Sequence, residues 1–463
     1  MLKSASTDPL RRRLLGGSAA SLIALSPLGQ AFARAGLGSE TGARAAGYGR
    51  LRPVADETTG LPLLELPEGF SYRSFGWAGE ALADGLGSIP GEADGMGLVR
   101  SEGEVFTLVR NHECVNLDGS FGPASSHYDA PCGGGTVTLR YDRAAGTLIE
   151  ARGSLSGTLQ NCAGGTTPWG SWLSCEEIVT PANHSGEYKG HAFQLTRAHG
   201  FVFEVPADGA SDARPLTALG QFRHEAAAVD PRDGVVYLTE DHRPAGFYRL
   251  LPTTPGKLIE GGRLQMLRVE SQPDLRRGLK PGQRFDVGWV DIEKPEAGWV
   301  EGGGMDGLLR QGRAQGASLF TRLEGLIIGE DEVFFTATDG GDAGSGQVFR
   351  FVPSSQTLEL FYESPGSAVL DYPDNICLGP KGLLVLCEDS DQPVQRLYGL
   401  DRAGGLFELA RNNAQLDGVF GHSGDFRGAE WAGACFSPDG RTLFANVYRP
   451  GFTVAITGPF DAA

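Results

Sequence analysis

Six stretches of the sequence begin with a side chain that can bind a metal ion and then lead into an apolar run. The six opening residues are Asp94, Cys162, Glu225, Glu324, Asp374 and Glu430. Five carboxylates and one thiol held close together repel one another unless they stay protonated or are neutralised by cations. Oxygen-rich ligand sets suit hard cations such as calcium, and a thiolate among them favours a transition metal. These residue types predict a mixed metal cluster wherever the fold brings them together.

A second set of acids closes most of these stretches, 14 to 19 positions after the opening residue. The set comprises Glu113, Glu176, Glu177, Glu240, Glu388 and Asp389. These acids would flank the opening set and extend it. Simpler interpretations remain open, because a solvated turn is the usual place for an acid such as Glu177, Glu240 or Glu430, and Cys162 also fits a plain buried cysteine.

The same stretches form an internal repeat, which must position these side chains. Each copy has an apolar run, a turn rich in Gly, Pro or Asp, and a second apolar run, most clearly at 225–241 and 374–389. Two short runs around a tight turn predict a β-hairpin. Aromatic segments such as 191–195, 246–250 and 347–351 supply a further strand. Glycine, at 69 of 463 residues, is roughly twice as frequent as usual, which is typical of many short strands joined by turns.

Six such units predict an all-β fold, a six-bladed β-propeller over residues 91–463. The units close about 50 to 64 positions apart, except for a gap of 98 positions after Glu240. We therefore expect an inserted segment between blades near residues 253–316. The first strand of each blade lines the central channel of a propeller, so the six opening residues would meet at one mouth of that channel. A sandwich of repeated hairpins is the alternative architecture.

The first 35 residues have the pattern of an export signal. Three arginines at 11–13 precede a moderately apolar stretch that runs to Leu28, and small residues suited to cleavage follow. This pattern predicts a twin-arginine signal peptide over residues 1–35, with residues 36–90 as an N-terminal extension of the propeller. Passage through the twin-arginine translocase would place the mature protein in the periplasm or outside the cell. A disordered basic N-terminus is the alternative.

The net charge and the number of cysteines limit the kinds of partner and the disulfide pairing that we expect. A formal charge of −17 at pH 7 repels nucleic acid and anionic membrane surfaces. After the N-terminal segment, no apolar run is long enough for a transmembrane helix. Seven cysteines leave at least one unpaired in an exported protein. We expect a monomer that acts on a small molecule, with no stable membrane insertion and with cations offsetting the acidic field where an anionic substrate binds.

Several motifs resemble those of the PhoX family of alkaline phosphatases. The most specific is segment 161–177, which begins Asn-Cys-Ala-Gly-Gly and ends Cys-Glu-Glu. The other similar segments are 222–231, 374–382, 386–389 and 432–440. The resemblance extends from about Asn111 to Pro450. It implies a six-bladed propeller that hydrolyses phosphomonoesters, with ferric iron (Fe3+) and calcium (Ca2+) clustered at the channel mouth.

The resemblance also implies roles for individual residues. The implied metal ligands are Cys162, Glu176, Glu225, Glu324, Asp374 and Glu388, with Cys162 on iron and the last two on calcium. In an Arg-x-Glu unit, Arg322 would bind the substrate phosphate with its planar guanidinium while Glu324 binds metal. A second phosphate-binding residue is not evident from the sequence. Arg223, Lys381 and Arg449 are the candidates.

Two other classes of function stay open at this point. A calcium-dependent propeller lactonase or esterase also places acids in a channel but needs no cysteine. A non-enzymatic binding propeller would use its metals only as structural supports. The sequence contains no Gly-x-Ser-x-Gly nucleophile elbow and no Walker phosphate loop, which argues against a serine hydrolase and a nucleotide-binding protein. No His-x-x-x-His pair supports a zinc site.

Overall fold

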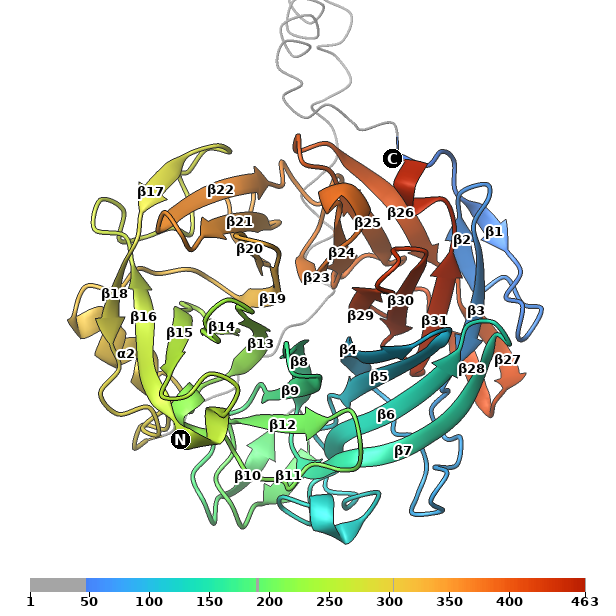
Figure 1. The fold of residues 1–463 in the computed structure, drawn as a ribbon, viewed down its shortest axis with the longest axis horizontal. Coiled ribbons are helices and arrows are strands. Elements are labelled where there is room, and N and C mark those ends of the chain that lie inside the picture. The colour runs from blue at the N-terminus through green and yellow to red at the C-terminus, as the bar shows by residue number, and fades with distance from the viewer. Residues whose placement is uncertain (1–46, 189–190, 303, 463) are drawn as a thin grey trace, which may run out of the picture. The chain divides into compact units, whose positions relative to one another are not determined.

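The strands form a ring of six blades around a central channel (Figure 1). The structure is a computed structural model and describes residues 47–188, 191–302 and 304–462. The predicted signal peptide at residues 1–35 lies outside the described residues. The innermost strands of the blades are β4 (Ala93–Glu102), β8 (Asn161–Thr166), β13 (His224–Val229), β19 (Leu323–Ile328), β23 (Pro373–Leu378) and β29 (Trp431–Phe436). Each of these strands contacts the next, and β29 contacts β4, so the ring is closed.

The first three blades follow one another along the chain, and their strands pair antiparallel. Blade one continues from β4 with β5 (Val105–His112), β6 (Gly134–Asp142) and β7 (Thr147–Thr158). Blade two continues from β8 with β9 (Ser171–Glu176) and β12 (Val202–Pro206), and a separate hairpin, β10 (Ser185–Tyr188) and β11 (His191–Gln194), lies between these two in sequence. Blade three continues from β13 with β14 (Val236–Glu240), β15 (Phe247–Pro252), β16 (Gly262–Arg268) and β18 (Gly288–Asp291).

The last three blades complete the ring in the same way. Blade four continues from β19 with β20 (Val333–Ala337), β21 (Gln347–Val352), β22 (Thr357–Glu363) and β17 (Arg284–Asp286). Blade five continues from β23 with β24 (Leu384–Glu388), β25 (Arg396–Leu400), β26 (Leu406–Asn412), β2 (Leu64–Leu66) and β1 (Arg52–Val54). Blade six continues from β29 with β30 (Thr442–Val447), β31 (Phe452–Thr457) and β3 (Ser71–Phe75). A hairpin of β27 (Gln415–Val419) and β28 (His422–Asp425) separates blades five and six in sequence. The six-bladed propeller predicted from the repeat is confirmed.

Short helical segments occupy only a few connections. The described residues contain one α-helix, α2 (Gly307–Ala314). The 3-10 turns are Ala124–Ser126, Thr217–Leu219, Leu258–Glu260, Pro380–Gly382 and Phe460–Ala462. No helix within the described ranges has the length and apolar character needed to cross a membrane.

The predicted insertion near 253–316 joins two blades. Its strands β16 and β18 extend blade three, whereas β17 pairs with β22 and becomes the outer strand of blade four. Helix α2 follows β18 and buries Leu308 and Leu309 against blade three. The segment is therefore an insertion in sequence that forms the outer layers of two neighbouring blades.

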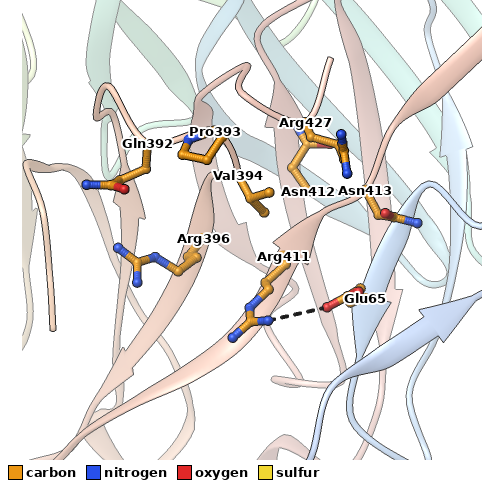
Figure 2. Close-up of a pocket in the computed structure, with 9 residues that line it drawn as sticks. All are labelled: Glu65, Gln392, Pro393, Val394, Arg396, Arg411, Asn412, Asn413 and Arg427. Atoms are coloured by element: carbon orange, nitrogen blue, oxygen red, sulfur yellow. Dashed lines mark ion pairs between the residues drawn. The ribbon is translucent and has the colours of Figure 1, made fainter. Parts of the chain in front are cut away.

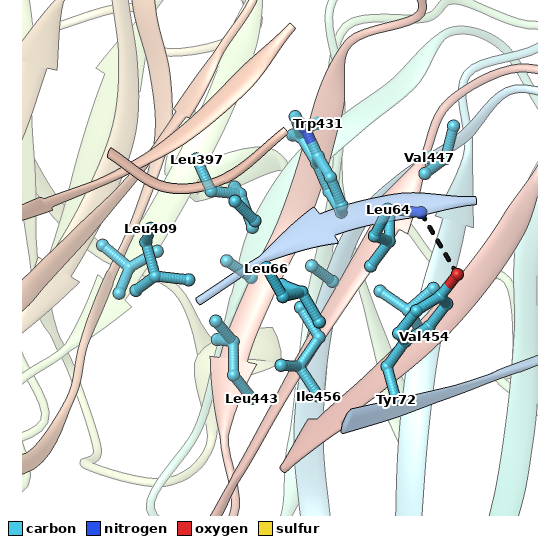
Figure 3. Packing of buried hydrophobic residues seen from close by; sticks show 14 of the residues in the cluster. Leu64, Leu66, Tyr72, Leu397, Leu409, Trp431, Leu443, Val447, Val454 and Ile456 are labelled. Atoms are coloured by element: carbon cyan, nitrogen blue, oxygen red, sulfur yellow. Dashed lines mark hydrogen bonds between the residues drawn. The ribbon is translucent and has the colours of Figure 1, made fainter. Parts of the chain in front are cut away.

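Strands from the N-terminal part of the described chain close the ring. β3 pairs with β31 at the outer edge of blade six, and β2 pairs with β26 at the outer edge of blade five. Figure 3 shows Leu64 and Leu66 of β2 packed among Trp431, Val454 and Ile456, all buried. Burying a side chain of this size stabilises a fold by roughly 1.5–3 kcal/mol. The strands between Arg52 and Phe75 thus join blades that lie far along the sequence.

One irregularity recurs in all six inner strands and positions the opening residues. Near its start each inner strand has a register shift, in which two residues of the inner strand are skipped by the pairing. The skipped position next to the strand start holds Asp94, Cys162, Glu225, Glu324 and Asp374 in the first five blades and Gly433 in blade six. Bulges of this kind re-aim a side chain away from its regular direction. Five of the six predicted opening residues share this local geometry, and Glu430 directly precedes β29 instead.

Candidate metal centre

A cavity of about 510 Å³ lies where the inner strands meet. It is lined by Glu113, Cys162, Glu177, Arg223, Asp241, His242, Arg243, Arg322, Glu324, Asp374, Asp389, Glu430 and Tyr448. Every blade contributes to this lining, as expected for a channel mouth. Acids and one thiol lie on the same surface as three arginines.

The inner-strand acids and the thiol form one continuous cluster. Three overlapping groups each bring their ligand atoms within 4.8 Å of one another. The groups are Asp94–Glu113–Cys162, Cys162–Glu177–Glu225 and Glu225–Glu324–Asp374. The thiol of Cys162 lies 3.6 Å from Asp94 Oδ2 and 3.7 Å from Glu177 Oε2. Of the predicted ligands, Cys162, Glu225, Glu324 and Asp374 are brought together here.

Electrostatics in this cluster favour bound cations. Burial raises the pKa of Asp94, Glu225 and Glu324 well above its ordinary value, and repulsion from neighbouring carboxylates raises the pKa of each further. Burial also raises the pKa of the Cys162 thiol. Glu225 is 1% exposed, and no hydrogen-bond donor among the described residues reaches its Oε2 atom. Because an unsatisfied buried carboxylate is costly, the residues present fit a site for multivalent cations.

One edge of the cavity carries the guanidinium groups. Arg322 Nη2 lies 2.5 Å from Glu324 Oε1, and Arg322 Nε donates to Asp241 Oδ1 at 3.0 Å. Arg223 donates to Glu177 and lies 3.7 Å from Asp241 Oδ2. Burial raises the pKa of Asp241, but Arg322 and Arg223 outweigh it and hold this pKa below the usual value. Asp241 therefore links two cationic side chains at the rim of the acid cluster.

Arg322 and Glu324 are two residues apart, which would place them on the same face if both lay in one strand. The structure brings them together in a different way. The strand β19 begins at Leu323, and Arg322 precedes it with φ at 38°, in the left-handed region that non-glycine residues seldom adopt. Simple alternation along a strand therefore does not explain why Arg322 and Glu324 lie together. The turn before the strand directs the guanidinium to the carboxylate.

The opposite edge of the cavity carries oxygen ligands. Tyr448 Oη donates to Glu113 Oε2 at 2.5 Å, and burial together with the charge of Glu113 raises the tyrosine pKa. Asp389 and Glu430 line the same cavity. Tyr448 was not predicted from the sequence; it directly follows β30, the second strand of blade six, just as Glu113, Glu177, Asp241 and Asp389 directly follow the second strands of blades one, two, three and five.

Two predicted ligands, Glu176 and Glu388, lie outside this cavity. Glu176 accepts hydrogen bonds from the backbone N–H groups of Leu159, Gly200 and Phe201. Glu388 accepts two hydrogen bonds from Arg396, at 2.8 and 2.6 Å. In both cases the next residue in the chain lines the cavity: Glu177 after Glu176, and Asp389 after Glu388.

The pairing of the strands explains this difference. Glu176 lies opposite Asn161 and Glu388 lies opposite Pro373, in each case the residue directly before an inner-strand ligand. Residues that are directly opposite share a face of the sheet, and successive residues alternate faces. The first acid of each doublet therefore points into its own blade, and the second points to the channel. Glu240 behaves in the same way, because its Oε2 atom accepts from Gly246 N and Tyr248 Oη while Asp241 lines the cavity.

The remaining phosphate-binding candidates separate clearly. Arg223 lines the cavity. Lys381 lies on an exposed 3-10 turn and donates to the backbone carbonyl of Asp461. Arg449 pairs with Glu92 at 3.1 Å, and its guanidinium lies over the Tyr448 ring. Of the three, only Arg223 joins Arg322 at the cavity.

A second cavity of about 280 Å³ lies at the outer strands of blade five (Figure 2). It contains three arginines, but each one has an acidic partner. Arg396 pairs with Glu388, Arg411 with Glu408 and Glu65, and Arg427 with Asp425. Figure 2 shows the Arg411–Glu65 pair across the cavity. No group of metal-binding side chains among the described residues lies at this cavity, so it is a weaker candidate for a cation-assisted anion site than the channel mouth.

The chain is a six-bladed propeller protein whose channel mouth carries candidate metal-binding clusters. Comparison with known families then gives a specific assignment. The model of the family described as alkaline phosphatase PhoX matches residues 47–147 and 142–451. The chain therefore belongs to the alkaline phosphatase PhoX family, whose members are phosphoric monoester hydrolases. A search of curated proteins found no match.

The solved structure of a PhoX protein has the same fold. Pseudomonas fluorescens PhoX in complex with vanadate, a transition state analogue, is similar with a TM-score of 0.63 and 18% identity, over 88% of this chain and 98% of that one. A protein of unknown function from Bacteroides thetaiotaomicron has a TM-score of 0.43 and 10% identity, over 84% and 76% of the two chains. A gluconolactonase from Xanthomonas campestris has a TM-score of 0.31 and 14% identity, over 83% and 100%.

Proposed function

We propose that this chain is a secreted, metal-dependent phosphomonoesterase that binds phosphate esters at the channel mouth. The observation that carries the proposal is the placement of Arg223 and Arg322 at the edge of a continuous acid and thiol cluster. Family membership supports the reaction type. The Pseudomonas fluorescens PhoX of the same fold was solved in complex with vanadate, a transition state analogue, and this supports the binding of a phosphate ester.

The ligand set divides by chemistry. Cys162, with Glu177 and Glu225 around it, combines a soft thiolate with carboxylates and fits ferric iron. The oxygen ligands Asp94, Glu113, Glu324, Asp374, Asp389, Glu430 and Tyr448 fit calcium. We therefore assign Glu177 rather than Glu176, and Asp389 rather than Glu388, as metal ligands. When bound, such cations neutralise charge on the phosphate and lower the pKa of an attacking water.

The side chains of this chain would bind and orient the substrate. Arg322 and Arg223 would hold phosphate oxygens, because a guanidinium presents paired donors that match a phosphate group. Asp241 keeps both arginines in place through its contacts with each of them. Phosphoryl transfer depends mainly on such positioning and on charge stabilisation, with little covalent chemistry for the protein to perform.

Arg322 gives the sharpest test. Arg322→Ala should lower turnover of p-nitrophenyl phosphate about a hundredfold, the loss expected for roughly 3 kcal/mol of transition-state stabilisation. It should keep its iron and calcium, because the substituted residue binds substrate and not metal. Glu324→Ala should lose metal as well as activity. Near-full activity in Arg322→Ala would remove the phosphate contact, and hydrolysis of lactones without hydrolysis of phosphate esters would overturn the proposal.

Export forms a separate part of the proposal. The arginines at 11–13 support a twin-arginine signal over residues 1–35. Replacing Arg11 and Arg12 by Lys should retain the precursor in the cytoplasm. Normal export of that variant would contradict the predicted route but not the phosphatase site. We also propose that the protein acts as a monomer, which its sedimentation behaviour would test.

A further inference from the structure

A second group of metal-binding side chains, outside the channel-mouth cavity, comes from connections of blades one and two. Asp129 and Cys132 lie in the connection before β6, and His199 lies just before β12. All three are buried, with exposures of 1%, 0% and 0%. None of them lines the channel-mouth cavity. The three form a cluster whose ligand atoms lie within 4.8 Å of one another.

The spacing of the ligand atoms suits a tetrahedral ion. His199 Nε2 lies 3.4 Å from Asp129 Oδ2 and 3.9 Å from Cys132 Sγ. Zinc–ligand bonds of about 2.0–2.1 Å to nitrogen, 2.0–2.2 Å to oxygen and 2.3 Å to sulfur separate N from O by roughly 3.4 Å and N from S by roughly 3.6 Å in a tetrahedron. The first separation agrees, and a shift of a few tenths of an ångström at Cys132 brings the second into agreement.

The other ring nitrogen of His199 fixes its orientation. Nδ1 lies 2.7 Å from Glu176 Oε1. Three backbone N–H groups already donate to the Glu176 carboxylate, so this carboxylate is an acceptor and His199 Nδ1–H donates a hydrogen bond to it. The Nε2 atom then faces Asp129 and Cys132. A carboxylate–histidine pair of this kind is the usual support of a metal-binding imidazole.

A positive charge must lie between Nε2 and the Asp129 carboxylate, because otherwise two electron-rich atoms face each other in a buried site. A proton on Nε2 is one solution. However, a charged N–H···O hydrogen bond is usually about 2.7–2.9 Å long, and the observed separation is 3.4 Å. The longer separation and the nearby thiol both suit a metal ion better.

We propose that Asp129, Cys132 and His199 bind a zinc ion, with Glu176 as the positioning residue for His199. A mixed set of sulfur, nitrogen and oxygen ligands is typical of zinc, and three protein ligands leave a fourth position for water. Asp129 also accepts hydrogen bonds from the backbone N–H groups of Thr196 and Arg197. The ion would therefore tie the connection before β6 to the segment that leads into β12. This inference is independent of the proposed phosphatase activity.

Metal analysis of the intact protein tests the site. Protein equilibrated with zinc and then dialysed should retain about one zinc ion, and Cys132→Ala and His199→Ala should each lose it. Cys435→Ala is the matched control, because Cys435 lies outside both clusters, and it should keep the zinc. Wild-type protein that retains no zinc, or a Cys132→Ala variant that retains as much as wild type, would overturn the site and leave a protonated hydrogen-bonded triad in its place.

Cobalt gives a second measurement that does not depend on comparing variant stabilities. Cobalt bound to a thiolate shows an intense near-ultraviolet charge-transfer absorption. Cys162→Ala removes the thiol of the channel-mouth cluster. Cobalt loading of this variant therefore reports on the site of Asp129, Cys132 and His199 alone. The absorption should appear in Cys162→Ala and disappear in the Cys132→Ala/Cys162→Ala double variant. No absorption in correctly folded Cys162→Ala protein would also overturn the proposal.

Discussion

The channel mouth and the interiors of the blades treat their buried carboxylates in opposite ways. At the channel mouth, Glu225 has an oxygen that no described donor reaches, and its neighbours are other acids. Inside the blades, Glu176 and Glu388 each accept several hydrogen bonds from backbone N–H groups or from an arginine. A buried charge is tolerable when it is paired or hydrogen-bonded. The comparison indicates that Glu176 and Glu388 stabilise the fold through bonds within the chain, whereas the buried Glu225 carboxylate is placed to take a ligand from outside the chain.

Removing metal should have the largest effect and should act through the channel mouth. Chelation of iron and calcium should abolish turnover of p-nitrophenyl phosphate and lower the melting temperature, because ions bound only by the folded state stabilise it. At an ion concentration of 1,000 Kd, each site contributes about 4 kcal/mol. Differential scanning calorimetry before and after chelation measures the loss. An unchanged melting temperature in metal-free protein would mean that the acid cluster is stable without cations.

The Glu388–Asp389 doublet compares the two regions within one blade. Asp389→Asn should lower calcium content and activity while leaving the fold intact. Glu388→Gln should keep both but lower the free energy of unfolding by about 1–3 kcal/mol, because it weakens a charged hydrogen bond to Arg396. Urea unfolding and elemental analysis of the two variants measure these effects. The reverse pattern, with calcium lost only from Glu388→Gln, would contradict the assignment of faces.

Glu240, at the end of β14 in blade three, should make the stability of the fold depend on pH. Burial raises its pKa from 4.5 to about 8, although Gly246 N–H and Tyr248 Oη donate to it. Since the folded state holds this proton more tightly than the unfolded state, the associated stability is full below pH 4.5 and is lost as pH rises to about 8. Glu240→Gln should remove this part of the pH dependence. Unfolding free energies at pH 5, 6, 7 and 8 test it, and an equal slope in variant and wild type would contradict the raised pKa.

The sequence predicted the architecture and the placement of the inner-strand acids and cysteine, because both follow from the repeat. Apolar hairpins with an acid or cysteine at the opening position carry the pattern themselves, and five of the six opening residues occupy the same bulge. The sixth position is Gly433, with φ at 61°, and Glu430 lies ahead of the strand. This exception depends on local backbone geometry that an apolar pattern does not record.

The closing doublets could not be resolved in the same way. Glu176 and Glu177 are identical in chemistry, and only the strand register decides which of them faces the channel. That register depends on the bulge between Asn161 and Gly164, where the inner strand has one residue more than its partner. One extra residue reverses the face of the sheet to which the neighbouring side chains point. The crossing of β2 and β3 into the last two blades was also beyond the repeat, since these strands pair with partners far along the chain.

The iron content of Glu176→Gln and Glu177→Gln, measured side by side, tests the central claim most directly. The two variants change neighbouring residues by the same small step, from a carboxylate to an amide. We expect Glu177→Gln to lose iron, because the Glu177 side chain lies beside Cys162 and Glu225. We expect Glu176→Gln to keep iron at the wild-type level. Iron lost from Glu176→Gln and retained in Glu177→Gln would show that Glu176, and not Glu177, binds the iron.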